Sequence, residues 1–444
     1  MKKSIYMVLC LIIVLSLSNI SCGFATDISG IKRNCKQGTF AAKTSCVSSS
    51  GMYAEDINKD KYKLPISQAK NNNTIISNIN PKADTNEEVI SENIIVVTSV
   101  AELMATESLT KTGNITVLIA DGDYVLPRGI YLTGSNITYK SQSGNRERVL
   151  LRGDFKISHI FQITNDNVTI QDMTIGQVNN HGIQLHSETD ADNAIIKNIR
   201  FFDIKEQMLK GSGASTEVYS NNCLVENCLF EFTKGVAYQY YTGGIDVHKG
   251  ESWIVRGNTF KNIISPTSSL SEGAIHFWSS SKNTLIENNT IINCDRGIML
   301  GLDNSYHYGG IVRNNMVHVV KDTGIYLANA DGASIYNNTV YVDSSYPNAI
   351  EYRFQATRNV EIINNVANKG IVSRNNGTAF LTSNITNAIE SWFVDTHKGD
   401  LHLASKVDEI VNKAIDLEQV KADIDNDIRK SGLSDLGADE YVTN

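Results

Sequence analysis

The stretch that decides the fold is a six-residue pattern, which occurs as VRGNTF at 255–260, IENNTI at 286–291, VRNNMV at 312–317 and IYNNTV at 335–340. Related copies precede it as IQDMTI, IKNIRF and VENCLF, and IINNVA follows it. Successive copies are offset by between 20 and 50 residues, a spacing typical of solenoids. Apolar and polar residues alternate inside each copy, which indicates short β-strands rather than helices. The sequence therefore predicts a coil of strands that repeats along the chain.

The fourth position of the pattern changes from apolar residues to asparagine along the chain. Its occupants are Met173, Ile199, Cys228, Asn258, Asn289, Asn315, Asn338 and Asn365. One Asn at the same point of each coil predicts a ladder, in which side-chain amides stack and bond to the backbone at a tight bend. We therefore interpret these residues as structural rather than catalytic.

A second segment in most repeats consists of Gly or Ala, then Ile, then an apolar residue two positions later. It occurs as GIQLH at 182–186, GIDVH at 244–248, AIHFW at 274–278, GIMLG at 297–301, GIYLA at 324–328 and AIEYR at 349–353. In GIDVH, the side chains of Ile245 and Val247 face one side of the strand, and those of Asp246 and His248 face the other. The apolar pair is expected in the core, so the polar pair should face water.

Stacked coils align these outward positions into two columns. The first column is predicted to contain Gln184, Asp246, His276, Met299, Tyr326 and Glu351, and the second His186, His248, Trp278, Gly301, Ala328 and Arg353. Aligning EQMLK at 206–210 with the same segment places Lys210 in the second column.

A cluster of basic groups is expected on this outer face, because neighbouring strands of a sheet are only about 4.8 Å apart. Its members are His186, Lys210, His248 and His276. Asp246 lies beside them, and Trp278 follows as a flat apolar surface of the kind on which sugars stack. By the same spacing, Glu351 and Arg353 lie about 19 Å from Asp246.

Together, these features resemble the right-handed parallel β-helix of pectate-lyase-like and chondroitinase-B-like exported proteins, over roughly residues 92–400. The resemblance implies an all-β, single-stranded solenoid. The segment VTSVAELMATESLTK predicts a short helix at its N-terminal end, with Ser99 as the N-cap. The irregular, acidic residues 401–444 resemble a closing segment that covers the last coil, where an open solenoid would expose its core and strand edges.

The N-terminus predicts export. Lys2 and Lys3 precede an apolar run of thirteen residues from position 5, which is short for a membrane span. Cleavage after Ala25 would give an ordinary signal peptide at 1–25, whereas Cys22 could carry a lipoprotein anchor. The residue three positions before Cys22 is Asn, where lipoprotein signals usually have Leu, so ordinary secretion is favoured.

Residues 26–91 are rich in Asn, Ser, Lys and Thr and are predicted to be a disordered polar linker. No later segment is apolar enough to span a bilayer. The expected location is therefore outside the cell, at its surface or in the periplasm.

A basic cluster beside a carboxylate suits proton abstraction from a uronic acid. Removing the C5 proton of such a sugar needs a base and a cation that neutralises the sugar carboxylate, and breaking the bond to O4 needs a proton donor. The predicted catalytic residues are Lys210, His248, Asp246, His276 and Tyr241, with Lys210 or His248 as the base and Tyr241 as the acid. The predicted substrate-binding residues are His186, Lys249, Trp278, Tyr326, Glu351 and Arg353.

The favoured function is a polysaccharide lyase that acts by β-elimination. A uronate C5-epimerase and a non-catalytic carbohydrate-binding or adhesin-type solenoid remain open. Hydrolysis is disfavoured, since it needs two carboxyls about 5–9.5 Å apart, whereas Asp246 and Glu351 are predicted to lie about 19 Å apart. The net charge of −8 argues against nucleic acid as a partner. The basic cluster makes an acidic polysaccharide the expected partner. Members of the resembled family often use calcium, which makes calcium a candidate cofactor.

Overall fold

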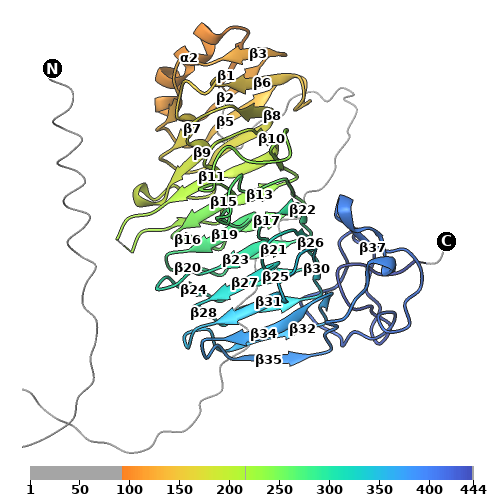
Figure 1. Cartoon of the computed structure of the whole chain (residues 1–444). Coiled ribbons are helices and arrows are strands. Elements are labelled where there is room, and N and C mark those ends of the chain that lie inside the picture. The colour runs from red at the N-terminus through yellow and green to blue at the C-terminus, as the bar shows by residue number, and fades with distance from the viewer. Residues whose placement is uncertain (1–92, 216, 443–444) are drawn as a thin grey trace, which may run out of the picture. The chain divides into compact units, whose positions relative to one another are not determined.

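The computed structural model describes residues 93–215 and 217–442; the predicted signal peptide and linker lie outside them. The described residues form a stack of coils built from short strands, which runs from β1 to β35 in Figure 1. The strands of successive coils pair in parallel. The predicted all-β parallel β-helix is therefore confirmed. Within the described residues, no helix has the length and apolar character needed to cross a bilayer.

Three sheets run along the stack. The largest has 20 strands: β1 (Asn93–Val97), β2 (Ile115–Ile119), β3 (Gly122–Val125), β5 (Ile137–Ser141), β6 (Val149–Arg152), β8 (Val168–Gly176), β10 (Ile195–Phe202), β13 (Leu224–Glu226), β14 (Leu229–Glu231), β17 (Ile254–Arg256), β18 (Thr259–Lys261), β21 (Leu285–Glu287), β22 (Thr290–Cys294), β25 (Ile311–Arg313), β26 (Met316–Val319), β29 (Ser334–Tyr336), β30 (Thr339–Val342), β32 (Val360–Ile363), β33 (Val366–Ala367) and β35 (Ala379–Thr382).

The sheet that carries the candidate site has 10 strands, one for each coil that it crosses. They are β4 (Ile130–Leu132), β7 (His159–Ile163), β9 (His181–His186), β11 (Gln207–Ser212), β15 (Gly243–His248), β19 (Ile275–Trp278), β23 (Ile298–Leu300), β27 (Ile325–Ala328), β31 (Asn348–Arg353) and β34 (Gly370–Arg374). A short sheet of 5 strands contains β12 (Ser220–Asn221), β16 (Gly250–Glu251), β20 (Ser281–Lys282), β24 (His307–Tyr308) and β28 (Ala330–Asp331).

The bend inside each six-residue pattern comes from its third position, where the backbone has a positive φ. The residues there are Asp172, Asn198, Asn227, Gly257, Asn288, Asn314, Asn337 and Asn364. Gly adopts this left-handed conformation without strain, and Asn and Asp tolerate it better than other residues. The chain therefore turns at the same point of each coil, for example between β13 and β14.

The predicted asparagine ladder forms at the fourth position. The side-chain amide nitrogen of Asn289 donates to Asn315 Oδ1 over 2.9 Å and to the backbone oxygen of Val255 over 2.9 Å. The same side-chain bond links Asn258, Asn289, Asn315, Asn338 and Asn365 in turn, and it continues to Asn384. Because these buried amides satisfy one another and the backbone, the ladder holds neighbouring coils in register.

The interior is filled by stacked apolar side chains. The ring of Phe230 stacks on that of Phe201 at 4.5 Å and on that of Phe260 at 4.6 Å, measured between ring centroids. These are the sixth residues of three successive patterns. Cys223, Cys228 and Cys294 are buried and free.

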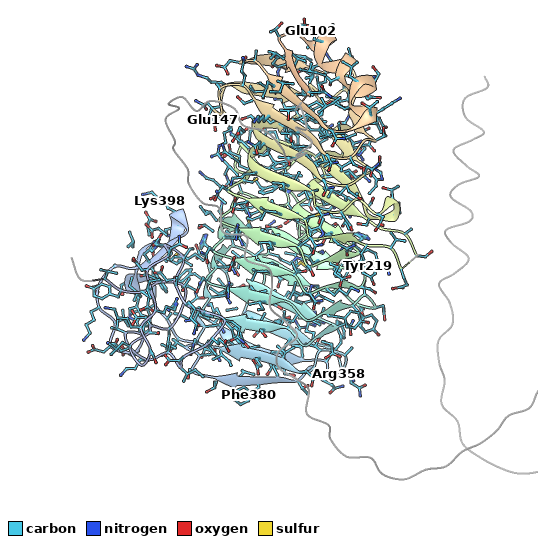
Figure 2. All side chains as sticks on the ribbon, turned by 180° about the vertical axis from the view of Figure 1, so that it is seen from behind. Glu102, Glu147, Tyr219, Arg358, Phe380 and Lys398 are labelled. Atoms are coloured by element: carbon cyan, nitrogen blue, oxygen red, sulfur yellow. The ribbon has the colours of Figure 1, made fainter. Side chains whose placement is uncertain are left out.

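One end of the stack carries the predicted helix, α2 (Val100–Leu109), which continues into η1 (Thr110–Thr112). Ser99 is its N-cap and accepts a hydrogen bond from the backbone N–H of Glu102 at 3.3 Å. Figure 2 shows Glu102 at this end of the stack and Phe380 of β35 at the opposite end. Phe380 is 61% exposed, so the last coil keeps an open apolar edge.

The C-terminal segment differs from the expectation that it covers this last coil. Where it begins, residues 390–403 form η3 (Glu390–Trp392), η4 (Thr396–Lys398) and an antiparallel pair of strands, β36 (Phe393–Asp395) and β37 (Asp400–Leu403). Its apolar residues pack on Met316 and Val366, which belong to the 20-stranded sheet. The segment therefore packs on the side of the stack.

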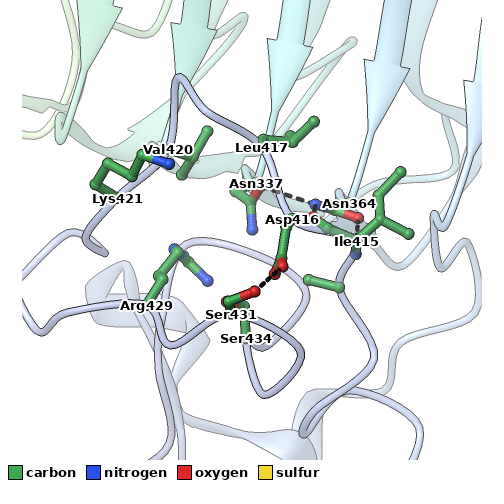
Figure 3. A pocket seen from close by; sticks show the side chains of 11 residues that line it. Asn337, Asn364, Ile415, Asp416, Leu417, Val420, Lys421, Arg429, Ser431 and Ser434 are labelled. Carbon is green, nitrogen blue, oxygen red and sulfur yellow. Dashed lines mark hydrogen bonds between the residues drawn. The ribbon is translucent and has the colours of Figure 1, made fainter.

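Side-chain amides of the bends anchor this segment. Asn364 Nδ2 donates to the backbone oxygen of Ile415 over 2.8 Å, and Asn337 Nδ2 donates to that of Asp435 over 3.2 Å. Figure 3 shows Asn337 and Asn364 in the small pocket between the stack and the segment, facing Ile415 and Asp416. The bends thus serve both the coil and the docking of the C-terminal residues.

Candidate active site

The outer face of the 10-stranded sheet carries the two predicted columns, but Lys210 lies in the first column rather than in the second. Strand pairing sets Lys210 opposite Gln184 on one side and Asp246 on the other. Lys210 therefore belongs to the first column, and Ser212 takes the second-column position opposite His186. The shift is two residues, which keeps the Lys210 side chain on the outer face because side chains alternate with a period of two.

Three side chains on this face form one hydrogen-bonded group, which we call the Lys210 group: Lys210, Asp246 and His248. Lys210 Nζ donates to Asp246 Oδ2 over 2.9 Å and to His248 Nε2 over 2.9 Å. Contrary to the expectation that these residues face water, Asp246 is only 2% exposed and Lys210 only 9%. Neighbouring side chains on the face cover them, and the His248 side chain is the most open of the three, at 22%.

The second oxygen of Asp246 is also bound. Trp278 Nε1 donates to Asp246 Oδ1 over 2.7 Å. The indole ring is nearly parallel to the His276 ring at 5.3 Å and lies 4.3 Å from the His248 ring. Trp278, expected as a sugar platform, is therefore also an anchor for Asp246, which the sequence pattern did not indicate.

Burial and charge set the protonation states of the Lys210 group. Burial alone would raise the pKa of Asp246, but the positive charge of Lys210 and the nearby imidazoles outweigh burial and hold the pKa below its ordinary value. Burial, followed by the charge of Lys210, lowers the pKa of His248 to about 4. At neutral pH, an ammonium thus lies between a carboxylate and a neutral imidazole whose Nε2 accepts a hydrogen bond.

His186 is held apart from this group by its own partners. Its Nδ1 is 2.8 Å from Glu188 Oε1, and its Nε2 is 3.1 Å from Gln162 Oε1. Ser212 Oγ donates to Glu188 Oε2 over 2.8 Å. His186 therefore belongs to a neighbouring polar network at the edge of the predicted site.

Lys249 and Tyr241 flank β15 on opposite sides in the sequence. Lys249 has a positive φ of 54°, and its side chain, which was predicted to bind substrate, is buried. Its Nζ is 3.4 Å from Glu217 Oε1 and lies over the ring of Tyr219, on the side of the 5-stranded sheet. Tyr241 is 44% exposed in the loop that leads into β15, and within the described residues it makes no side-chain hydrogen bond to the Lys210 group.

A second polar group surrounds Glu351, which is fully buried. Its carboxylate accepts hydrogen bonds from Asn348 Nδ2 at 2.6 Å, from Arg374 Nη1 at 3.0 Å and from the Tyr346 hydroxyl. Arg374 was not predicted, because GIVSR at 370–374 has Ser373 where the second segment has an apolar residue; strand pairing places Arg374 in the second column, opposite Arg353. Glu351 is therefore engaged in protein contacts rather than open to substrate.

Arg353 is a second cation on this lower part of the face and is partly buried, whereas Arg374 is exposed. Its Nη1 donates to the Tyr326 hydroxyl over 3.0 Å, and its guanidinium lies over the ring of Phe354. Strand pairing runs from β15 through β19, β23 and β27 to β31, so Arg353 lies four strands from His248, about 19 Å away at the usual spacing. The sheet thus carries two polar groups that only an extended ligand could contact together.

The residues present do not fit calcium at Asp246. Calcium takes six to eight oxygen ligands, whereas the two oxygens of Asp246 accept from the Lys210 ammonium and the Trp278 indole. A calcium ion there would have to displace both donors.

The family comparison agrees with the architecture. The family described as "Right handed beta helix region" matches residues 236–384. The described chain is a right-handed parallel β-helix. No curated protein matches the sequence.

Three solved structures are similar to this chain at low identity. The β-helix is similar to "PL6 family alginate lyase AlyGC", with 15% identity, a TM-score of 0.39, and coverage of 62% of this chain and 43% of that one. It is similar to "alginate lyase AlyF-OU02 with G6", with 14% identity, a TM-score of 0.41, and coverage of 65% and 72%. It is also similar to the A-module of the Azotobacter vinelandii mannuronan C-5 epimerase AlgE4, with 13% identity, a TM-score of 0.37, and coverage of 66% and 92%. This chain thus spans less than half of the AlyGC chain, and the likeness concerns the fold alone.

Proposed function

We propose that the protein is a lyase that cleaves a uronic-acid polysaccharide by β-elimination, with the Lys210 group as its reaction centre. The observation that carries the proposal is the pair of 2.9 Å hydrogen bonds from Lys210 to Asp246 and to His248 on the outer face of a long sheet. A cation, a base and an anchoring carboxylate are the parts that proton abstraction next to a carboxylate requires.

The low pKa of His248 suggests how substrate activates the base. The Lys210 ammonium contributes to the lowered pKa and also occupies the Nε2 lone pair. A sugar carboxylate that binds this ammonium would replace His248 as its acceptor and neutralise its charge. The pKa of His248 would then rise, because the effect of the Lys210 charge is removed while that of burial remains, and the Nε2 lone pair would be free to accept a proton.

The chemical step follows from this arrangement. His248 Nε2 takes the C5 proton, and the electron pair of the C5–H bond forms the double bond between C4 and C5. The bond from C4 to O4 breaks, and O4 takes a proton from Tyr241, which stays the predicted acid. Asp246 keeps the Lys210 ammonium beside the sugar carboxylate throughout. The products are an unsaturated uronate and a new chain end with a free hydroxyl.

The second polar group supports a polymeric substrate. Arg353 presents a cation about 19 Å from His248 along the same face. A second carboxylate of the same polysaccharide chain could pair with it, which would favour long substrates over short ones.

The test is incubation of the full chain with alginate, pectate and chondroitin while the ultraviolet absorbance of the unsaturated product is followed. His248→Gln should abolish product formation, whereas His397→Ala, at a histidine whose side chain is 68% exposed, should leave it unchanged. Absence of product from every uronate polymer would refute the lyase. Deuterium uptake at C5 without cleavage would then indicate an epimerase, and binding without either reaction would indicate an adhesin-type protein.

A further inference from the structure

A second set of polar atoms is buried beside the Lys210 group, where the chain enters β11, β15 and β19. Within the described residues, Gln207 Nε2 and Oε1, Glu272 Oε2 and His276 Nδ1 are buried and lack hydrogen-bond partners. A Cβ built on Gly243 would lie 3.2 Å from Glu272 Cβ and 3.5 Å from Gln207 Cγ. His276 Nδ1 is 3.4 Å from Glu272 Oε2. The side chains thus gather around the space that Gly243 leaves.

The hydrogen bond on the far side of the His276 ring fixes its tautomer. His276 Nε2 is 3.1 Å from the backbone oxygen of Gly301, and a carbonyl oxygen can only accept. Nε2 therefore carries the hydrogen, and Nδ1 of the neutral ring presents a lone pair toward the Glu272 carboxylate. Two electron-rich atoms in this position repel each other unless a proton or a metal ion lies between them.

The distance between these two atoms favours a metal ion. A hydrogen bond from an imidazolium to a carboxylate usually closes to about 2.7–2.9 Å, which is shorter than the 3.4 Å observed. Two ligands that are each about 2.0–2.2 Å from a tetrahedral zinc ion are about 3.3–3.6 Å apart. A carbonyl acceptor on the other ring nitrogen is also the usual support of a metal-binding histidine.

We propose that Glu272, His276 and Gln207 bind a divalent ion of the zinc class. The Nδ1 of His276, the Oε2 of Glu272 and the amide oxygen of Gln207 supply one nitrogen and two oxygen ligands, which suits a borderline ion such as Zn²⁺. The exposed part of the Glu272 side chain, 25%, gives the ion a route from solvent. This site is separate from the carboxylate of Asp246, and it does not depend on the proposed reaction.

His276 differs from the histidines of two other clusters in offering a free ring lone pair. His318 lies near Asp343 and His397, but its Nδ1 accepts from a backbone N–H at 3.2 Å, which places the hydrogen on Nε2, the atom nearest Asp343. His402 has a carboxylate oxygen within 2.8 Å of each ring nitrogen, which favours the imidazolium. Neither ring offers a free lone pair to a metal ion.

A bound ion would support the reaction centre from the neighbouring strand. Strand pairing places His276 directly beside Asp246, and the His276 ring stacks on Trp278. Fixing His276 would therefore also fix the indole that donates to Asp246.

The experiment measures Zn²⁺ binding to the full chain after dialysis against a chelator. Titration calorimetry should show one Zn²⁺ per chain, and thermal unfolding should shift upward with added Zn²⁺. Glu272→Gln, which keeps the shape of the side chain, and His276→Ala should each weaken binding by at least about tenfold. His397→Ala, in the other cluster, should bind Zn²⁺ as the unchanged protein does. Circular dichroism checks that each variant is folded.

Co²⁺ provides a second readout, because cysteine thiolates give it an intense near-ultraviolet band that nitrogen and oxygen ligands do not. The expected spectrum lacks this band. Failure of the unchanged protein to bind Zn²⁺, or full retention of binding in folded Glu272→Gln, would overturn the proposal. A stability that depends on pH and not on Zn²⁺ would show that a proton, not a metal ion, joins His276 and Glu272.

Discussion

Replacing Asp246 by Asn tests whether the Lys210 group is a buried, paired cluster. The substitution keeps the size of the side chain and an oxygen for the Trp278 indole, but it removes the negative charge that accepts from Lys210 at 2.9 Å. Lys210 is 9% exposed, so solvent replaces little of the lost interaction. Removing one partner of a buried ion pair costs about 3–5 kcal/mol.

This free energy converts into a change in melting temperature. The entropy of unfolding is about 2.1 cal/mol/K per residue, or about 0.7 kcal/mol/K for the roughly 350 residues described, so the melting temperature should fall by about 4–7 °C at pH 7. Differential scanning calorimetry measures it.

A matched substitution at a surface ion pair provides the control. Asp121→Asn breaks the 3.1 Å pair with Arg148, in which both side chains are well exposed, and should not measurably change the melting temperature. If Asp246→Asn lowers the melting temperature by less than about 1 °C, as expected for the control, the ion pair is not buried: Lys210 and Asp246 are then solvated in solution.

Three further predictions concern the fold. Asn315→Ala should lower the free energy of unfolding by about 1–3 kcal/mol, measured by urea unfolding, because it leaves buried ladder partners unsatisfied; an unchanged midpoint would contradict the ladder. Gly301→Ala should prevent folding or melt far below the unchanged protein in calorimetry, because φ is +73° and the new Cβ would lie 1.9 Å from a backbone oxygen of the next coil; normal stability would show that the backbone there differs. Burial opposes the charged form of His402, but bonds to Asp400 and the charge of Asp425 raise its pKa above the ordinary value. The protonated His402 therefore stabilises the fold fully below its unfolded pKa, about 6.5, and this stabilisation is lost as the pH rises through the folded pKa. Melting temperatures measured against pH should fall above about pH 6.5, and His402→Gln should abolish this fall. Equal pH profiles for the two proteins would contradict the prediction.

The repeat could be predicted from sequence because each coil carries its own local signals. A six-residue pattern with one bend contains all that is needed to place its strands, and neighbouring copies support one another. The third position carried a further signal that the predicted pattern did not use: Asn288, Asn314 and Asn337 all have a positive φ, and Asn is among the residues that best tolerate it. Arg374 follows the Gly-Ile that begins the second segment, but Ser373 interrupts the apolar pattern there.

The candidate site could be predicted only in part, because its contacts join different coils. The coil between β9 and β15 departs from the pattern, and only strand pairing shows that Lys210 lies opposite Asp246. Glu272 lies outside the strand pattern, and nothing in its local sequence indicates that it approaches His276. Side chains of adjacent coils decide whether an outward residue meets water.

The sequence by itself determined the architecture of this protein: parallel coils, an internal asparagine ladder and a capping helix, all of which follow from short-range patterns of hydrophobicity and backbone preference. Only the tertiary structure decided that Lys210 contacts both Asp246 and His248, that Asp246 is buried on an outer face, and that the C-terminal segment packs against the side of the stack. The physical reason is that these features depend on which side chains from distant parts of the chain become neighbours when the coils stack. The burial and the pKa of a residue are set by those neighbours as well as by the residue itself.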